Sequence, residues 1–187
     1  MPRQVFVYDS PERFVAGTVG APGERTFYLQ ASAEGRVTSV ALEKEQVSLL
    51  AQRIEQLLDE VVRVTGGATS VPAASPADLD DLDPLEQPVL ADFRVGTMAL
   101  AWDGDAKRAV IEAQAVTEDA EEQSSIPDDD AEDGPDLLRV RLTGAQARAF
   151  AKRALAVVAA GRPPCPFCGL PLDPAGHICP RQNGYRR

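Results

Sequence analysis

The sequence predicts an α+β fold, built from a tandem β-β-β-α pseudo-repeat and a C-terminal module resembling a zinc knuckle or zinc ribbon. Two observations predict the repeat: short sequence matches between the halves, and three strand-like segments before a helix-like segment in each half. A third observation predicts the module, because every Cys and the only His of the chain lie in the last 23 residues. The expected domains are 1–64, a flexible linker 65–87, 88–160 with an acidic disordered insertion 118–135, and a zinc-binding tail 161–187.

The matches between the halves have two spacings. Phe14–Val19 and Phe93–Met98 both read F-x-x-G-T followed by an apolar residue, and they lie 79 positions apart. A second set recurs 100 positions later: Val40, Leu42, Gln46, Ala51 and Arg53 match Val140, Leu142, Gln146, Ala151 and Arg153. The growth in spacing is close to the length of the acidic insertion. Chance similarity among common apolar residues is the alternative.

In the first half, two predicted turns separate three strand-like segments. These turns are Ala21-Pro22-Gly23 and Glu34-Gly35, and Gly66-Gly67 ends the helix that follows. The expected strands are Arg13–Gly20, Arg25–Ser32 and Arg36–Leu42, before an amphipathic helix over about 43–62. Val5–Tyr8 could add an edge strand.

The second half repeats this order. Asp103-Gly104 is a hairpin-turn signal, and Thr143 with Gln146 matches the capping box that begins a helix. The expected strands are Phe93–Trp102, Lys107–Val116 and Leu137–Leu142, before an alanine-rich helix that ends near Ala160. A small β-β-β-α unit buries little surface alone, so we expect the two units to pack together.

The two remaining segments have the composition of unstructured chain. Residues 65–87 are rich in Gly, Ala, Ser, Pro and Asp, without a sustained period. Residues 118–136 hold ten acidic side chains and no Lys or Arg, which accounts for the whole net charge of −10. An acidic protein is not a typical general nucleic-acid binder. Without a transmembrane run or signal peptide, and with its cysteines clustered, the protein is expected to be cytosolic.

The tail carries the pattern C-x2-C-x8-H-x-C, which predicts one structural zinc bound by Cys165, Cys168, His177 and Cys179. Two cysteines separated by two residues let a tight turn aim both sulfurs at one point, and Gly169 permits φ > 0 there. Three thiolates and an imidazole fill a tetrahedral shell, which is typical of structural zinc. Free thiols and a redox C-x-x-C are the alternatives, although a redox pair would open a helix. A filled zinc site would leave no free Cys or His for nucleophilic catalysis, so no catalytic residue is predicted.

The residues after the last ligand are the candidate recognition surface. They are basic and carry one aromatic ring, and the candidates are Arg181, Asn183, Tyr185, Arg186 and Arg187. Arginine suits phosphate or carboxylate contacts, and tyrosine can stack on a base. The alternative is that these arginines dock on the protein's own acidic surface.

The tail CPFCGLPLDPAGHICPRQNGYRR, with RFVAGTVG at Arg13–Gly20 and RTFYLQ at Arg25–Gln30, resembles an actinobacterial family, the domain of unknown function numbered 3090. The resemblance covers nearly the whole chain. It implies no established activity and transfers no catalytic residue.

These patterns favour a non-catalytic binding or adaptor protein with a protein partner and no membrane association. Two other functions stay open. One is nucleic-acid binding through the arginine tail, and the other is an enzyme acting on a phosphorylated or nucleotide substrate between the repeats. A deep polar pocket there would favour the enzyme, and a filled apolar interface would oppose it.

Overall fold

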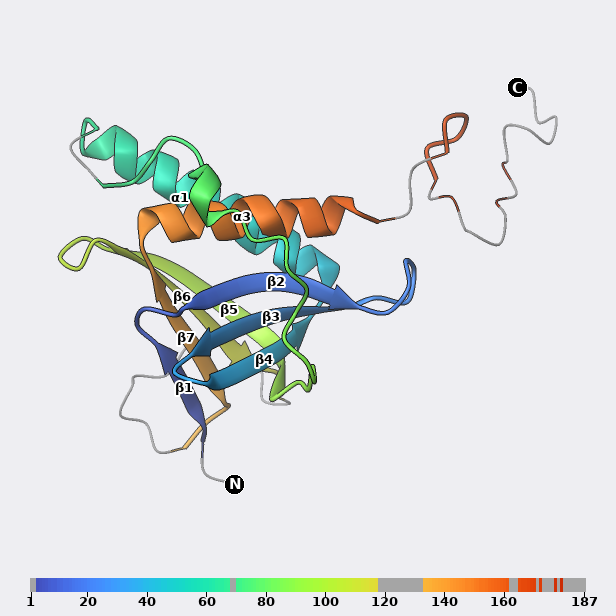
Figure 1. The fold of residues 1–187 in the computed structure, drawn as a ribbon, viewed down its shortest axis with the longest axis horizontal. Helices are drawn as coiled ribbons and strands as arrows, with labels where there is room; N and C mark the ends of the chain where they lie inside the picture. Colours follow the sequence, from blue (N-terminus) through green and yellow to red (C-terminus); the bar gives the residue numbers. More distant parts are fainter. Residues whose placement is uncertain are drawn as a thin grey trace.

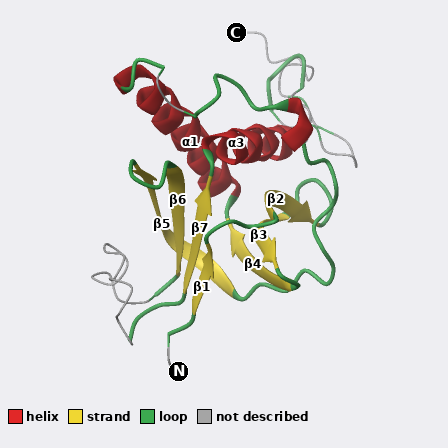
Figure 2. Ribbon diagram, turned by 60° about the vertical axis from the view of Figure 1, so that its left-hand side comes forward, coloured by secondary structure: helices red, strands yellow, loops and turns green. Residues whose placement is uncertain are grey.

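The computed structural model describes residues 3–67, 70–117, 133–161, 165–170, 172, 177 and 179. In this part of the chain, helices α1 (Lys44–Val64) and α3 (Gly144–Ala159) lie on one side of a curved seven-stranded sheet (Figures 1 and 2). The α+β class is therefore confirmed. Neither described helix combines the length and apolar character needed to cross a bilayer.

The first half contains β2 (Arg13–Val19), β3 (Thr26–Ala33), β4 (Arg36–Leu42) and then α1. Its three strands form an antiparallel meander. Glu34 and Gly35 both have positive φ, 53° and 73°, as a two-residue hairpin turn with the right twist requires. A capping box between Glu43 and Gln46 begins α1, whose buried face follows the predicted helical spacing.

The second half contains β5 (Phe93–Asp103), β6 (Arg108–Ala115), β7 (Leu137–Leu142) and then α3. The β5–β6 turn forms because the Asp103 carboxylate accepts the backbone N–H groups of Asp105 and Ala106. The predicted capping box of Thr143 and Gln146 begins α3. Each half thus has three antiparallel strands followed by a capped helix.

The halves join into one sheet with the order β1-β7-β6-β5-β4-β3-β2. The joint is short, because β4 and β5 pair in parallel only at Val40–Phe93 and Ala41–Arg94. The predicted N-terminal edge strand, β1 (Val5–Tyr8), is confirmed and pairs in parallel with β7. Figure 2 shows the strands as two groups meeting at this joint.

The helices bind the halves into one core, because each helix packs against the first strand of the other half. Helix α1 lies against β5 and α3 against β2. The Phe14 and Phe150 rings stack with centroids 4.6 Å apart, and Ile54 and Leu58 are fully buried between the layers. An aromatic pair of this kind contributes about 0.5–1.5 kcal/mol beyond its buried area. The interface between the halves is therefore filled by apolar side chains.

The described part of segment 65–87 is packed against the body, which differs from the expectation of a flexible linker. Val71 is buried against Gly144, and Leu85 is buried directly over Gly17. Between them the short helix η1 (Ala77–Leu79) precedes Asp81, which forms ion pairs with Arg13 and Arg153. The composition misleads because the contacts that order this segment come from residues distant in sequence. Of the predicted acidic insertion, residues 118–132 lie outside the described residues.

Candidate metal centre

The candidate metal centre begins with a tight turn shortly after α3. The Gly169 N–H donates to the Cys165 carbonyl oxygen at 2.8 Å, and the Cys165 N–H donates to the Leu170 carbonyl oxygen at 2.7 Å. Gly169 has φ +76°, the left-handed conformation expected for the residue after the second cysteine. This turn brings Cys165 and Cys168 to the same side of the loop.

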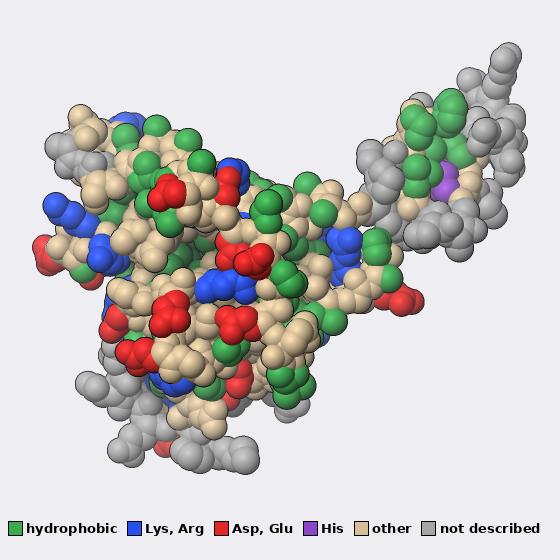
Figure 3. Space-filling view, viewed as in Figure 1, with side chains coloured by type: hydrophobic (Ala, Val, Ile, Leu, Met, Phe, Trp, Pro, Cys, Tyr) green, Lys and Arg blue, Asp and Glu red, His purple; other side chains and the backbone are tan. Residues whose placement is uncertain are grey.

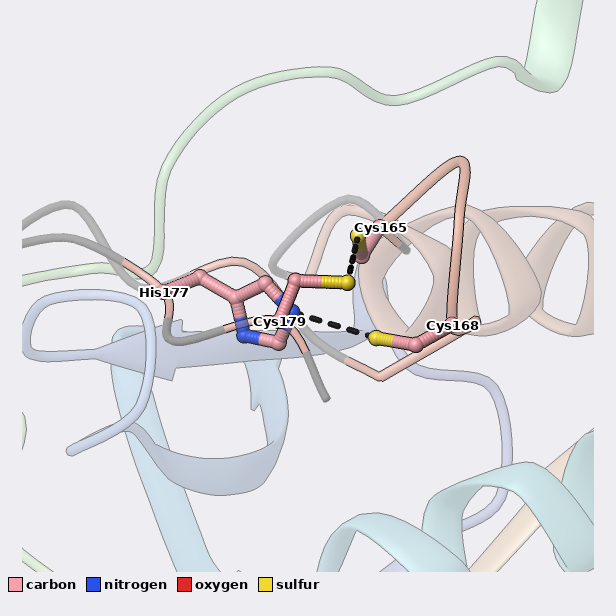
Figure 4. Close-up of side chains that lie close together, drawn as sticks. All are labelled: Cys165, Cys168, His177 and Cys179. Atoms are coloured by element: carbon pink, nitrogen blue, oxygen red, sulfur yellow. Dashed lines mark hydrogen bonds between the residues drawn. The ribbon is translucent and has the colours of Figure 1, made fainter. Parts of the chain in front are cut away.

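The four predicted ligands converge (Figure 4). One ligand atom from each of Cys165, Cys168, His177 and Cys179 lies within 4.8 Å of the others. The Cys165 and Cys179 sulfurs are 3.9 Å apart, and the Cys168 Sγ to His177 Nε2 distance is 3.1 Å. Tetrahedral zinc–thiolate bonds would separate two sulfurs by about 3.8 Å. The cluster therefore has nearly the dimensions of a four-ligand metal site.

The cysteines of this cluster are free thiols, which excludes a disulfide among them in this structure. Backbone N–H groups of Cys168 and Phe167 point at the Cys165 sulfur and lower the pKa of this thiol to about 6. Desolvation instead raises the pKa of Cys168. The turn thus stabilises a thiolate at Cys165, the form in which cysteine binds metals.

The module displays two apolar side chains that sequence reasoning did not single out. Phe167 is 58% exposed and Leu170 50% exposed, on either side of Cys168 and Gly169. Figure 3 shows apolar groups beside the single histidine, at the end of the molecule away from the two-helix body. The sequence could have indicated this pair, because both residues are apolar and occupy non-ligand positions of the C-x2-C-x8-H-x-C pattern.

The other predicted site residues, Arg181, Asn183, Tyr185, Arg186 and Arg187, lie outside the described residues. Sequence reasoning also missed a buried arginine in α3. Arg148 is only 2% exposed and pairs with Glu55 and Asp59 of α1. These ion pairs join the two helices and are structural in kind.

A polar substrate site between the halves receives little support from the described residues. The cavity at β2, α3 and η1 has a volume of about 110 Å³. Small-molecule sites usually occupy at least about 300 Å³. Three of its charged side chains, Arg13, Asp81 and Arg153, already pair with one another. The larger hollow between α1 and β5, about 490 Å³, is lined mainly by apolar side chains.

Comparison with protein families gives a match over residues 6–179, which includes the body and all four candidate ligands. The matching model is described as a protein of unknown function, DUF3090. The chain belongs to the DUF3090 family. No curated protein and no solved structure matched this DUF3090 chain.

Proposed function

We propose that this DUF3090 protein binds one structural zinc ion through Cys165, Cys168, His177 and Cys179. The support is the donor set, since three thiolates and one imidazole suit zinc better than magnesium or calcium. Four protein donors also complete a tetrahedral shell and leave no position for a substrate or an activated water. When bound, the ion would hold the Cys165–Leu170 turn together with His177 and Cys179.

We further propose that the protein is a non-catalytic binding or adaptor protein, whose metal-held module presents Phe167 and Leu170 to a protein partner in the cytosol. The observation that carries this proposal is the exposure of both side chains on a turn whose backbone is tied by hydrogen bonds. Exposed apolar groups on a preorganised loop can bind a partner at a low entropic cost.

Site-specific photo-crosslinking in the native cell tests the adaptor function. A crosslinker at Phe167 should capture a defined protein, and one at Leu82, which is 94% exposed on the body, is the control. Capture should fall at least about tenfold when Leu170→Ser or Cys168→Ser is added, as expected when an apolar anchor or its support is lost. If crosslinkers at Phe167 and Leu82 capture protein equally, and Leu170→Ser and Cys168→Ser have no effect, the support for an adaptor is lost.

Nucleic-acid binding is the second candidate, because three arginines follow the last ligand within eight residues. Binding of this kind would weaken steeply with salt, since arginines displace counterions from phosphates. It would also disappear when Arg181, Arg186 and Arg187 are changed to Ala together. Binding that is insensitive to both would exclude the tail as a nucleic-acid site.

We also propose that the two halves are copies of one ancestral β-β-β-α unit. Equal element order, a capping box at Gln46 and Gln146, and Gly-Thr at Gly17 and Gly96 support this origin. Superposition of the backbones of the two halves tests it. Failure of the first-strand glycines and the helix-start glutamines to coincide would contradict a duplication.

A further inference from the structure

Two grooves lie between a helix of one half and the first strand of the other half, and they differ in what covers them. The groove beside α3 and β2 is covered by residues 79–86, here called the covering segment. The groove beside α1 and β5 is open and has a volume of about 490 Å³. We call it the open groove, and its walls include Leu49, Arg53, Leu57, Met98 and Leu100.

The covering segment shows how such a groove recognises an extended chain. Arg153 donates to the Ala16 carbonyl oxygen at 2.9 Å and to the Asp81 carboxylate at 2.7 Å. The side chain of Leu85 fills the space above Gly17. An arginine on the helix thus holds a carboxylate, while an apolar side chain of the segment packs against the strand.

The open groove offers the same kinds of contacts without a segment in place. Arg53, which matches Arg153 in sequence, donates only to Gln56 of its own helix among the described contacts. Leu49 is 52% exposed, and Met98 and Leu100 are only partly buried. At Gly96 the backbone of Val116 occupies the space that Leu85 fills over Gly17, so the open groove begins beyond it, at Met98.

The backbone edge of β5 runs along this groove. Strand β4 pairs with β5 only at Phe93 and Arg94. The Val95 and Gly96 carbonyl oxygens accept from the Gln46 side chain, and the edge from Met98 onward has no strand partner among the described residues. A second hollow, with Trp102, Val64 and Lys107 in its walls, continues the groove toward the end of α1. An unpaired edge beside an apolar wall can accept an extended peptide as an added strand.

Local charge indicates the kind of peptide. Arg53 and Lys107 carry positive charge along the groove, and Glu60 is neutralised by its ion pair with Arg63. The edge from Met98 to Trp102 spans about 17 Å at about 3.3 Å per residue. The site therefore has room for about five extended residues with at least one carboxylate.

We propose that the open groove binds an extended acidic segment of a partner protein, which adds to the β5 edge. A carboxylate of the partner pairs with Arg53, and an apolar side chain packs between Leu49 and Met98. The covering segment of this chain shows the arginine–carboxylate and leucine contacts of such a ligand, although among the described residues it forms no strand with β2. The proposal uses none of the residues of the metal module, so it stands or fails separately from the zinc and adaptor proposals.

Binding of a labelled synthetic peptide with the sequence of residues 77–88 to the full-length protein tests the groove. We expect saturable binding, with amide chemical-shift changes at Leu49, Met98 and Leu100. Arg53→Glu should weaken the binding at least about tenfold, the cost of replacing one charge-assisted contact by a repulsion. Lys44→Glu, at the exposed start of the same helix, makes an equal charge change and should leave binding unchanged.

Leu49→Glu provides a second variant at an exposed position, should Arg53→Glu fail to fold, and it should weaken binding to a similar extent. A peptide of the same composition in scrambled order should bind at least about tenfold more weakly. Shifts confined to β2 and α3 would mean exchange with the covering segment and would overturn the proposal. The proposal would also be overturned if the peptide does not bind or if the variants bind it equally well. It would likewise be overturned if a second copy of the chain occupies the groove.

Discussion

The two-helix body and the C-terminal module are held together by different interactions. The body has an apolar core shared by both halves, with Phe14 stacked on Phe150 and ion pairs around Arg148 and Asp81. The described residues of the module have a turn of two backbone hydrogen bonds and four converging ligand atoms. Hydrophobic burial can therefore maintain the body, whereas we propose that the short module depends on a bound ion to hold its shape.

The largest expected effect is loss of the metal. Removing zinc with a chelator, or making Cys168→Ser, should unfold the module and leave the body intact, because structural zinc contributes about 10–16 kcal/mol to such small sites. Limited proteolysis should then cut within 165–179 and spare the body. A body whose thermal unfolding midpoint falls together with the loss of zinc would contradict this separation.

Phe150→Ala should destabilise the body by about 3–5 kcal/mol, because it leaves a cavity in the core beside Phe14. Zinc content should not change. Phe167→Ala is the matched control in the module, where the ring is 58% exposed, and its effect on unfolding of the body should stay within about 0.5 kcal/mol. Urea unfolding measures both, and equal losses of stability would contradict the comparison.

Gly17→Ala should destabilise the body by about 1–3 kcal/mol, because the new methyl group overlaps the buried Leu85. An ideal Cβ at Gly17 would lie 2.5 Å from the Leu85 Cγ. Gly104→Ala is the control, since a Cβ there meets nothing within 4 Å. Thermal unfolding, with proteolysis of residues 77–90, would show whether the covering segment is released. No difference between the two variants would show that Leu85 does not depend on Gly17.

The smallest effect concerns pH. The hydrogen bonds from Arg13 hold the pKa of Asp81 below its ordinary value of 3.8. A lowered folded-state pKa adds stability that is present above 3.8 and is lost as the pH falls through the folded-state value. After allowance for solvent screening, the contribution is about 1 kcal/mol or less. Asp81→Asn should therefore lower stability at neutral pH and flatten its decline below about pH 4. If stability falls equally steeply below about pH 4 in Asp81→Asn and in the unchanged protein, this role of Asp81 is contradicted.

Local patterns in the sequence predicted the elements and the cluster of candidate ligands. Turn residues such as Glu34-Gly35, the capping box at Gln146, and the spacing of the cysteines each act within a few residues. The structure places strands and helices at these positions within about two residues, the usual scatter of such boundaries.

Distant contacts could not be predicted in this way. The crossing of α1 onto β5 and of α3 onto β2, and the brief β4–β5 joint, depend on the packing of whole elements. The covering segment was missed because its contacts with Arg13, Arg153 and Gly17 join residues 68 or more positions apart. Its leucines at 79, 82 and 85 were a faint signal, since they recur every three residues in an otherwise polar stretch.

The zinc site can be tested by X-ray absorption spectroscopy at the zinc edge of the purified full-length protein. We predict one zinc per chain with three sulfur ligands at about 2.3 Å and one imidazole nitrogen at about 2.0 Å. A shell that includes an exchangeable water oxygen, or a protein that carries no zinc at its four-ligand cluster, would contradict it.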